Sequence, residues 1–403
     1  MVRSQLEKAM ENGQGILRLA PVWVPRSFCR PGKRIKLHPD DYYALGLERG
    51  GIDERWFAST TQADNGPGTP GDEGLSYVLL DPDGQTRILL CDAVDLLQGD
   101  LIGHDLWREE GRWPMFSKFF DNAGPLPHHI HQRDAHAARV GMSGKPEMYF
   151  FPSQLNNHGG EFPFTFFGLN PETSREQVRD ALAMFPRGDN KLLDLSRAYK
   201  LVLDTGWDVP PGVLHAPGSL CTYEPQVASD VYAMYQSVLL NGQCVPEDLL
   251  WKNSPPEERG NIEYLLEVID WEQNVDPAFS ERHFMRPLPV RPEAAMAEDG
   301  YLEEWICYRC PAVSAKRLTV RPGRTAVIRD MAAYGLICIQ GHGRIGPHAL
   351  SSPTLIRYGQ LTEDEYFVSE PAASVGVTLV NPSQTEDLVI LKHFARNPDC
   401  PVA

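Results

Sequence analysis

Three histidines and one glutamate in this sequence have the types and spacing of ligands for a single metal ion. His129 and His131 lie two residues apart, and alternate side chains of a strand point to the same face, so both imidazoles can reach one ion. Glu147 stands in an aromatic run that predicts a second strand after a turn at residues 141–144. His215 follows a Pro-Pro-Gly turn at the start of another strand. Together they predict a divalent metal site that would act as a Lewis acid.

The identity of the metal stays open at this stage. A single histidine in a strand is more often a hydrogen-bonded core or surface residue, so the prediction depends on the whole ordered set. Catalytic zinc commonly has three protein ligands and an open position, whereas three histidines and a glutamate also suit manganese, iron, nickel or cobalt. We therefore predict one divalent metal per chain, in the first part of the sequence.

The segments that position these ligands are predicted to be strands, with a small helical insert. A chain of 403 residues exceeds one ordinary core, so we predict two domains, at residues 1–285 and 286–403. Strands are expected over 16–24, 113–120 and 223–240. A helical insert is expected at about 170–200. Its first helix would have Thr173 as N-cap, with Glu176 completing a capping box, and its second, short helix would cover 192–200. Another helix is expected over 261–271.

The second predicted domain reads as all-β. Residues 276–299 carry four prolines and predict a linker, and from residue 301 short apolar runs alternate with turn residues. Its two central histidines, His342 and His348, are not two apart and have no matching glutamate and later histidine. We predict that this domain is metal-free and serves packing.

Composition and charge limit the kinds of partner that the protein is expected to bind. Apolar residues make up 42% and charged residues 23%, which are values of a globular protein. A net charge of −16 disfavours nucleic acid and anionic membranes as partners, and no apolar run approaches the length of a membrane span, so a cytoplasmic location is expected. The eight cysteines are scattered, and the one close pair, Cys307 and Cys310, has no second pair at zinc-ribbon spacing, so they read as buried thiols.

Several motifs, in order, resemble the type I mannose-6-phosphate isomerase family of two-domain cupins. The segments are WPMFSKFFD at 113–121, LPHHIHQRDAHA at 126–137, GKPE at 144–147, PGVLHA at 211–216 and YEPQ at 223–226, with Ser229 and Asp230 beyond them. The resemblance covers about residues 16–275. It implies a mainly β fold of two cupin barrels, each a double-stranded β-helix or jelly roll.

The resemblance also implies an activity and roles for residues. It implies a metal-dependent aldose–ketose isomerase with zinc held by the four ligands named above, acting on a small carbohydrate. Glu224, Lys145 and Lys118 would be catalytic, with Glu224 as the base and Lys145 facing a developing oxyanion. Arg139 and Asp230 would contact the substrate. The oligomeric state is not predicted.

Two positions depart from the family pattern. His129 replaces a glutamine at the first ligand position, which makes the set that of an ordinary metallo-cupin. Met234 stands where the family has an arginine, and its loss removes a fixed cation that would neutralise a phosphate or an enediolate. The substrate is therefore either a sugar or a sugar phosphate. A metallo-cupin oxygenase and a non-catalytic sugar-binding protein are the alternatives.

Overall fold

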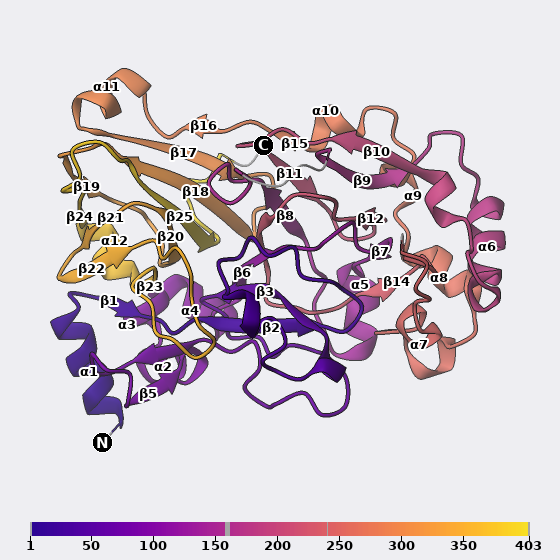
Figure 1. Ribbon diagram of the computed structural model, residues 1–403, viewed down its shortest axis with the longest axis horizontal. Coiled ribbons are helices and arrows are strands. Elements are labelled where there is room, and N and C mark those ends of the chain that lie inside the picture. The colour runs from indigo at the N-terminus through magenta and orange to yellow at the C-terminus, as the bar shows by residue number, and fades with distance from the viewer. Residues whose placement is uncertain (1, 158–161, 240, 402–403) are drawn as a thin grey trace.

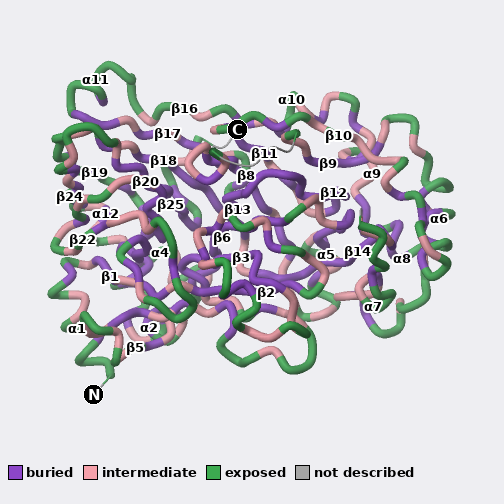
Figure 2. Tube along the Cα trace, viewed as in Figure 1, coloured by how far each residue is buried: buried purple, intermediate pink, exposed green. Residues whose placement is uncertain are grey.

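Antiparallel sheets dominate the computed structural model, which describes residues 2–157, 162–239 and 241–401 (Figure 1). The chain is mainly β, as predicted. Among the described residues no sheet closes on itself, and the two-barrel arrangement stays a prediction. Figure 2 shows that the central strands are largely buried, whereas the connecting loops at the edges are exposed.

Two sheets from the first part of the chain carry the predicted ligands. One has seven strands, in the order β15 (Phe284–Met285), β11 (Gly206–Val209), β8 (Glu147–Phe150), β13 (Thr222–Val227), β6 (Met115–Phe120), β3 (Gly51–Phe57) and β2 (Val22–Arg26). The other has five, in the order β10 (Ser196–Lys200), β9 (Phe164–Leu169), β12 (His215–Ala216), β7 (His129–Ile130) and β14 (Ala233–Met234).

The later part of the chain forms a second pair of sheets. The larger has the order β1 (Ile16–Arg18), β23 (Glu365–Val368), β20 (Tyr334–Gln340), β25 (Leu388–Ala395), β18 (Val313–Val320), β17 (Tyr301–Cys307) and β16 (Leu288–Pro289). The smaller has β19 (Thr325–Ile328), β24 (Val377–Val380), β21 (His342–Ile345) and β22 (His348–Ser351). A separate hairpin pairs β4 (Tyr77–Leu79) with β5 (Arg87–Leu89).

The first strand of the chain belongs to the sheet of the last 120 residues. Ile16 pairs with Val368, so β1 forms an edge of that sheet, and in Figure 1 the indigo helix α1 (Val2–Asn12) lies beside the yellow strands. The division of the chain into two domains at residue 285 remains a prediction. The sequence predicted one strand over 16–24, which is wrong, because the segment divides at Pro21 into β1 and β2 of different sheets. Proline has no backbone N–H to continue a ladder.

Helices are short and lie mainly outside the sheets, with α6, α7 and α8 together at one end of the molecule in Figure 1. Besides α1, the α-helices are α2 (Leu90–Leu97), α3 (Gly99–Ile102), α4 (His104–Glu110), α5 (Asp134–Ala137), α6 (Arg175–Ala183), α7 (Glu247–Leu250), α8 (Ile262–Val268), α9 (Trp271–Asn274), α10 (Phe279–His283), α11 (Glu293–Glu298) and α12 (Glu370–Val375).

Three helix predictions need correction. Helix α6 begins after Ser174, not Thr173, because Ser174 and Gln177 form the reciprocal capping box. The helix predicted over 192–200 is a 3-10 turn at Leu192–Leu195 followed by β10. The helix predicted over 261–271 ends at Val268, where the backbone of Ile269 becomes extended and the Asp270 N–H donates to the carbonyl of Gly212. The predicted linker contains α10, β15, β16 and α11, which its prolines keep short.

A buried ion pair connects the two parts of the chain. Arg55 of β3 donates from both terminal nitrogens to the carboxylate of Asp364 at 2.8 Å, and lies 3.4 Å from Glu365. Its guanidinium also stands over the ring of Trp23. These charges are almost fully buried, so their mutual pairing offsets a large desolvation cost.

Replacing Arg55 with methionine should therefore leave two buried carboxylates without their cation. We expect the free energy of unfolding, measured by urea denaturation, to fall by about 3–5 kcal/mol. Arg3→Met is the matched control, because Arg3 pairs with Glu7 through side chains that are 64% and 54% exposed and should contribute little. Equal unfolding midpoints for the two variants would contradict a structural role for the Arg55 pair.

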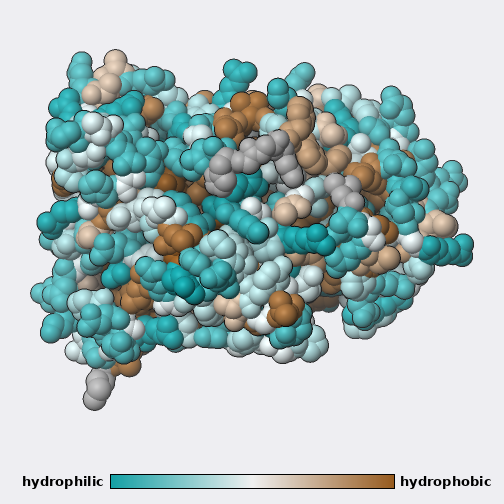
Figure 3. Space-filling model, viewed as in Figure 1, coloured by the Kyte–Doolittle hydropathy of each residue, from teal (hydrophilic) through white to brown (hydrophobic). Residues whose placement is uncertain are grey.

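The visible surface is mainly hydrophilic. In Figure 3 the apolar residues form separate small groups on a largely polar face. Within the described residues, no helix has the length and apolar character needed to cross a membrane.

Candidate metal centre and the charged row beside it

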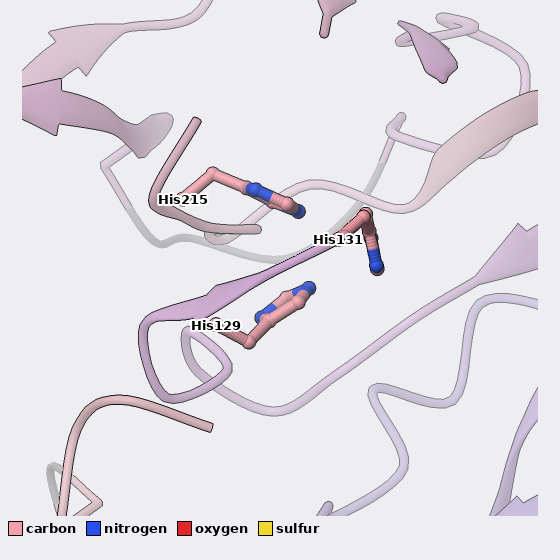
Figure 4. A group of neighbouring side chains, drawn as sticks. All are labelled: His129, His131 and His215. Carbon is pink, nitrogen blue, oxygen red and sulfur yellow. The ribbon is translucent and has the colours of Figure 1, made fainter. Parts of the chain in front are cut away.

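The three predicted histidine ligands converge in the structure. The potential ligand atoms of His129, His131 and His215 all lie within 4.8 Å of one another, and the three side chains are buried. Figure 4 shows the imidazoles grouped around a common space, two from the segment of β7 and one from β12. His215 pairs in register with His129, which places the two rings side by side with centroids 4.2 Å apart. We call these residues the histidine triad.

Backbone carbonyls hold each ring of the triad in one orientation. Nδ1 of His129 lies 3.0 Å from the Pro127 carbonyl, Nδ1 of His131 lies 2.8 Å from that of Val231, and Nδ1 of His215 lies 2.9 Å from that of Val213. A carbonyl can only accept, so Nδ1 carries the proton and donates it, which leaves the Nε2 lone pair free for a ligand. This is the arrangement that orients metal-binding histidines.

The Pro-Pro-Gly turn before His215 is hydrogen-bonded to the segment that carries His131. Gly212 has a φ of +88°, which favours glycine, and its N–H donates to the carbonyl of His131 at 2.8 Å. Asn274 of α9 then donates to the Gly212 carbonyl at 2.7 Å and accepts from the N–H of Leu214 at 2.9 Å. The turn therefore sets the distance between β7 and β12.

Glu147 faces the triad from the neighbouring sheet. Its carboxylate oxygens lie 3.0 Å from Nε2 of His131 and 3.2 Å from Nε2 of His215. With Nδ1 protonated, these ring nitrogens are acceptors that face another acceptor, and Nε2 of His215 is buried without a hydrogen-bond partner among the described residues. Such a convergence of lone pairs requires positive charge nearby. The Lys145 ammonium supplies part of it, at 2.9 Å from Glu147 and 3.2 Å from Nε2 of His131. The three histidines can hold a metal ion, and Glu147 as its fourth ligand stays a prediction.

Electrostatics keep this set ready to bind a cation at neutral pH. Burial, followed by the neighbouring His215 and His131, holds the pKa of His129 well below its usual value, and burial lowers the pKa of His131 to about 4. Burial alone would raise the pKa of Glu147, but His131 and Lys145 outweigh it and hold it well below the usual value. His129 and His131 are thus neutral near pH 7, and Glu147 is ionised.

A line of acidic and basic residues crosses the sheet that carries Glu147. Consecutive strands β8, β13, β6, β3 and β2 each contribute one member, and we call these five residues the charged row: Glu147, Glu224, Lys118, Glu54 and Arg26. Lys118 bridges Glu224 at 3.3 Å and Glu54 at 3.2 Å, and Arg26 reaches Glu54 at 3.2 Å. All five are buried.

Lys145 joins the charged row to the triad. Its ammonium lies 2.9 Å from Glu147, 3.2 Å from Nε2 of His131 and 3.6 Å from Glu224. Tyr149 donates a further hydrogen bond to Glu147 at 2.7 Å. The predicted catalytic residues Glu224, Lys145 and Lys118 are therefore brought together beside the triad.

Glu224 has a strongly perturbed environment within the charged row. Burial and the charge of Glu147 raise its pKa to about 8, against the opposing effect of Lys118 and Lys145. Its Oε1 atom is buried, 3.3 Å from the Lys118 ammonium and 3.6 Å from that of Lys145. A carboxyl group with a pKa near neutrality is suited to accept and return a proton.

Asp230 closes the far end of the row. Arg26 lies 3.2 Å from Asp230, and this cation outweighs the effect of burial and lowers the pKa of Asp230 to about 2. The folded pKa is below the value of about 3.9 expected in the unfolded chain. The ionised carboxylate therefore stabilises the fold fully above pH 4, and that contribution is lost as the pH falls through 2.

We accordingly expect Asp230→Asn to lower the free energy of unfolding by about 2–3 kcal/mol at pH 6. The difference from the unchanged protein should shrink as the pH is lowered from 4 toward 2. Asp248→Asn, at an exposed position, serves as the control and should change nothing. A difference for Asp230→Asn that is constant with pH would rule out this linkage.

The structure does not bring every predicted residue to the triad. Arg139 is part-exposed and pairs with Glu257 at 3.2 Å and Glu258 at 2.7 Å, so its proposed contact with substrate remains a prediction. Met234, where the family has arginine, is buried on β14 opposite His129. Sequence reasoning missed Arg26 and Glu54, although charged residues within the apolar runs of two strands were a usable signal.

Comparison with known proteins rests on structure. No protein-family model matches the chain, and no curated protein matches it by sequence. Among solved structures, mannose 6-phosphate isomerase from Bacillus subtilis aligns with a TM-score of 0.59 and 15% identity over 94% of this chain and 99% of that one. A variant of phosphomannose isomerase from Salmonella typhimurium aligns with a TM-score of 0.62 and 11% identity over 95% and 100%. A mannose 6-phosphate isomerase bound with zinc and yttrium aligns with 0.60 and 11% over the same shares.

The chain therefore has the fold of the phosphomannose isomerases along nearly its full length. The resemblance seen in the motifs is confirmed at the level of the fold. At these identities the likeness establishes architecture, and the chemistry has to be argued from the residues themselves.

Proposed function

We propose that this protein is a metal-dependent aldose–ketose isomerase that acts on a sugar or a sugar phosphate. The observation that carries the proposal is the position of Glu224 within the charged row, next to Lys145 and beside a histidine triad whose free nitrogens converge with Glu147. The fold of two cupin barrels and the ligand set of His129, His131, Glu147 and His215 are part of the proposal. Zinc is the first choice of metal, because a structural neighbour contains it.

The bound divalent ion would supply Lewis acidity toward the carbonyl and adjacent hydroxyl oxygens of the substrate. Glu224 takes the proton from the carbon next to the carbonyl and returns it to the neighbouring carbon. Lys145 offsets the negative charge that develops on oxygen. The pKa of Glu224 should fall when a cation offsets the charge of Glu147, which increases the fraction of ionised base.

The nature of the substrate follows from the cations that are available. Lys118 and Arg26 are already paired with buried carboxylates, and the arginine expected from the family is Met234. No described residue of the charged row therefore offers an unpaired cation to a phosphate group. An unphosphorylated sugar is as well supported as mannose 6-phosphate.

Solvent exchange tests the proposal directly. The protein, loaded with zinc, manganese or cobalt, should be incubated in D₂O with mannose, fructose, mannose 6-phosphate or fructose 6-phosphate. We expect deuterium at C1 or C2 of at least one sugar by NMR, and loss of exchange after chelation. Oxygen consumption in place of exchange would favour the oxygenase, and tight binding without exchange would favour a non-catalytic sugar-binding protein.

A further inference from the structure

A cavity that no residue of the triad lines lies between the two sheets of the later part of the chain. Its volume is about 720 Å³, within the range of about 300–1,000 Å³ that holds small-molecule ligands. Strands β17 and β18 form one wall and β19 the other, and these strands are neighbours at the upper left of Figure 1. The first of these walls presents the aromatic side chains of Tyr301 and Trp305.

Four buried charges stand on and behind this wall, and we call them the ionic quartet: Glu303, Lys316, Asp330 and Lys392. Lys392 lies 2.5 Å from Glu303 and 2.6 Å from Asp330, and Lys316 lies 2.6 Å from Asp330. All four side chains are at most 5% exposed. Glu303 and Lys316 line the cavity itself, and the Lys316 ammonium stands 4.5 Å from the ring centre of Trp305.

Packing alone does not explain the ionic quartet. Each buried ion costs several kcal/mol of desolvation, and well-packed apolar residues of similar volume are often equally or more stabilising. Most of the remaining buried interior between these sheets is apolar, with Leu318, Val320 and Ile390 in register beside the charges. A mixed set of donors and acceptors next to aromatic faces is what a polar ligand requires, rather than what packing requires.

The rim of the cavity carries charges of both signs, because Asp299 and Asp399 line it together with two arginines. Arg329 is exposed, and its Nε donates a hydrogen bond to the carbonyl of Val375 at 3.1 Å. Arg291 pairs with Asp299 at 2.6 Å and also lines the cavity. A ligand that reaches from Trp305 to this rim would meet hydroxyl partners inside and a guanidinium at the entrance.

We propose that this cavity is a second binding site, for a sugar-sized polyhydroxylated compound that carries one anionic group. Its hydroxyls would hydrogen-bond with Glu303 and Lys316, and an apolar face would lie against Trp305. The anionic group would contact Arg329, whose planar donors suit carboxylate and phosphate. The site is separate from the triad, so it does not depend on the isomerase proposal. It revises the expectation that this part of the chain serves only packing.

Calorimetric titration of the intact protein tests the proposal. Gluconate and mannose 6-phosphate are the polyhydroxylated anions, mannose supplies hydroxyls without charge, and inorganic phosphate supplies charge without hydroxyls. Val327 lines the cavity and is 49% exposed, so Val327→Trp should block the site without disturbing the core. Val202→Trp, at a position 52% exposed and not among the residues that line the cavity, is the matched control.

We expect at least one of the two anions to bind, and Val327→Trp to weaken that binding at least tenfold while Val202→Trp leaves it unchanged. Arg329→Gln should weaken gluconate more than mannose. Metal content and thermal stability should be the same in all variants, which separates this result from failure at the triad. Unaltered binding in Val327→Trp would overturn the proposal. So would the complete loss of binding of both anions in His131→Ala, because the binding would then belong to the triad.

Discussion

Isomerase turnover is expected to fall by about 10²–10⁴-fold when Glu224 is replaced by glutamine, because the amide cannot accept the proton that a general base removes. Metal content and substrate affinity should be retained, since the amide has nearly the same shape as the carboxyl group. The measurement is deuterium exchange into the active sugar, together with the steady-state rate.

Glu304→Gln is the control for this substitution. Glu304 is also ion-paired, at 2.8 Å from Arg317, but belongs to β17, away from the triad. It should keep full turnover. If Glu224→Gln exchanges protons as fast as the unchanged protein does, the base is another residue, and the role given to the charged row is wrong.

Metal binding should be lost most clearly in His131→Ala. Loss of a partner behind a ligand typically weakens metal binding 10–100-fold, and removal of a ligand should cost at least as much. Metal content, measured by mass spectrometry of protein dialysed against a fixed free zinc concentration, should fall accordingly. Lys145 loses a contact in the same variant, so the unfolding transition should be recorded alongside.

His283→Ala separates a metal ligand from an ordinary buried histidine. His283 is buried, pairs with Asp208 at 3.0 Å and stacks on Phe279, outside the triad. Its loss should leave the metal content unchanged. Full metal occupancy in His131→Ala would remove the triad as the site.

The sequence was sufficient to predict the histidine triad because local rules place those residues. His129 and His131 follow from strand alternation, and the Pro-Pro-Gly turn marks where His215 begins its strand. The order of strands is a different matter, since it is set by pairing between distant segments. Arg26 and Glu54 reach the site only because β2 and β3 extend the sheet beyond β6, and no local pattern encodes that order.

The ionic quartet could not be predicted from the sequence for the same reason. Glu303 and Lys392 are 89 positions apart (392 − 303) and come together only through the pairing of β17, β18 and β25. In contrast, the helix errors near residues 174 and 268 are errors of boundary, where caps and tertiary contacts decide the last turn. The error over 192–200 is one of type, because residues 196–200 pair with β9 as a strand. Arg139 matched a family motif, and its surface position depends on acidic partners more than 100 residues away.

The pairing of β1 with β23 has a consequence for synthesis in the cell. Ile16 leaves the ribosome about 350 residues before Val368, its partner, which at ordinary translation rates is on the order of tens of seconds earlier. During that interval β1 has no partner strand, and the backbone groups that it will pair with β23 stay unpaired. The second large sheet can therefore be completed only after β23 has been synthesised.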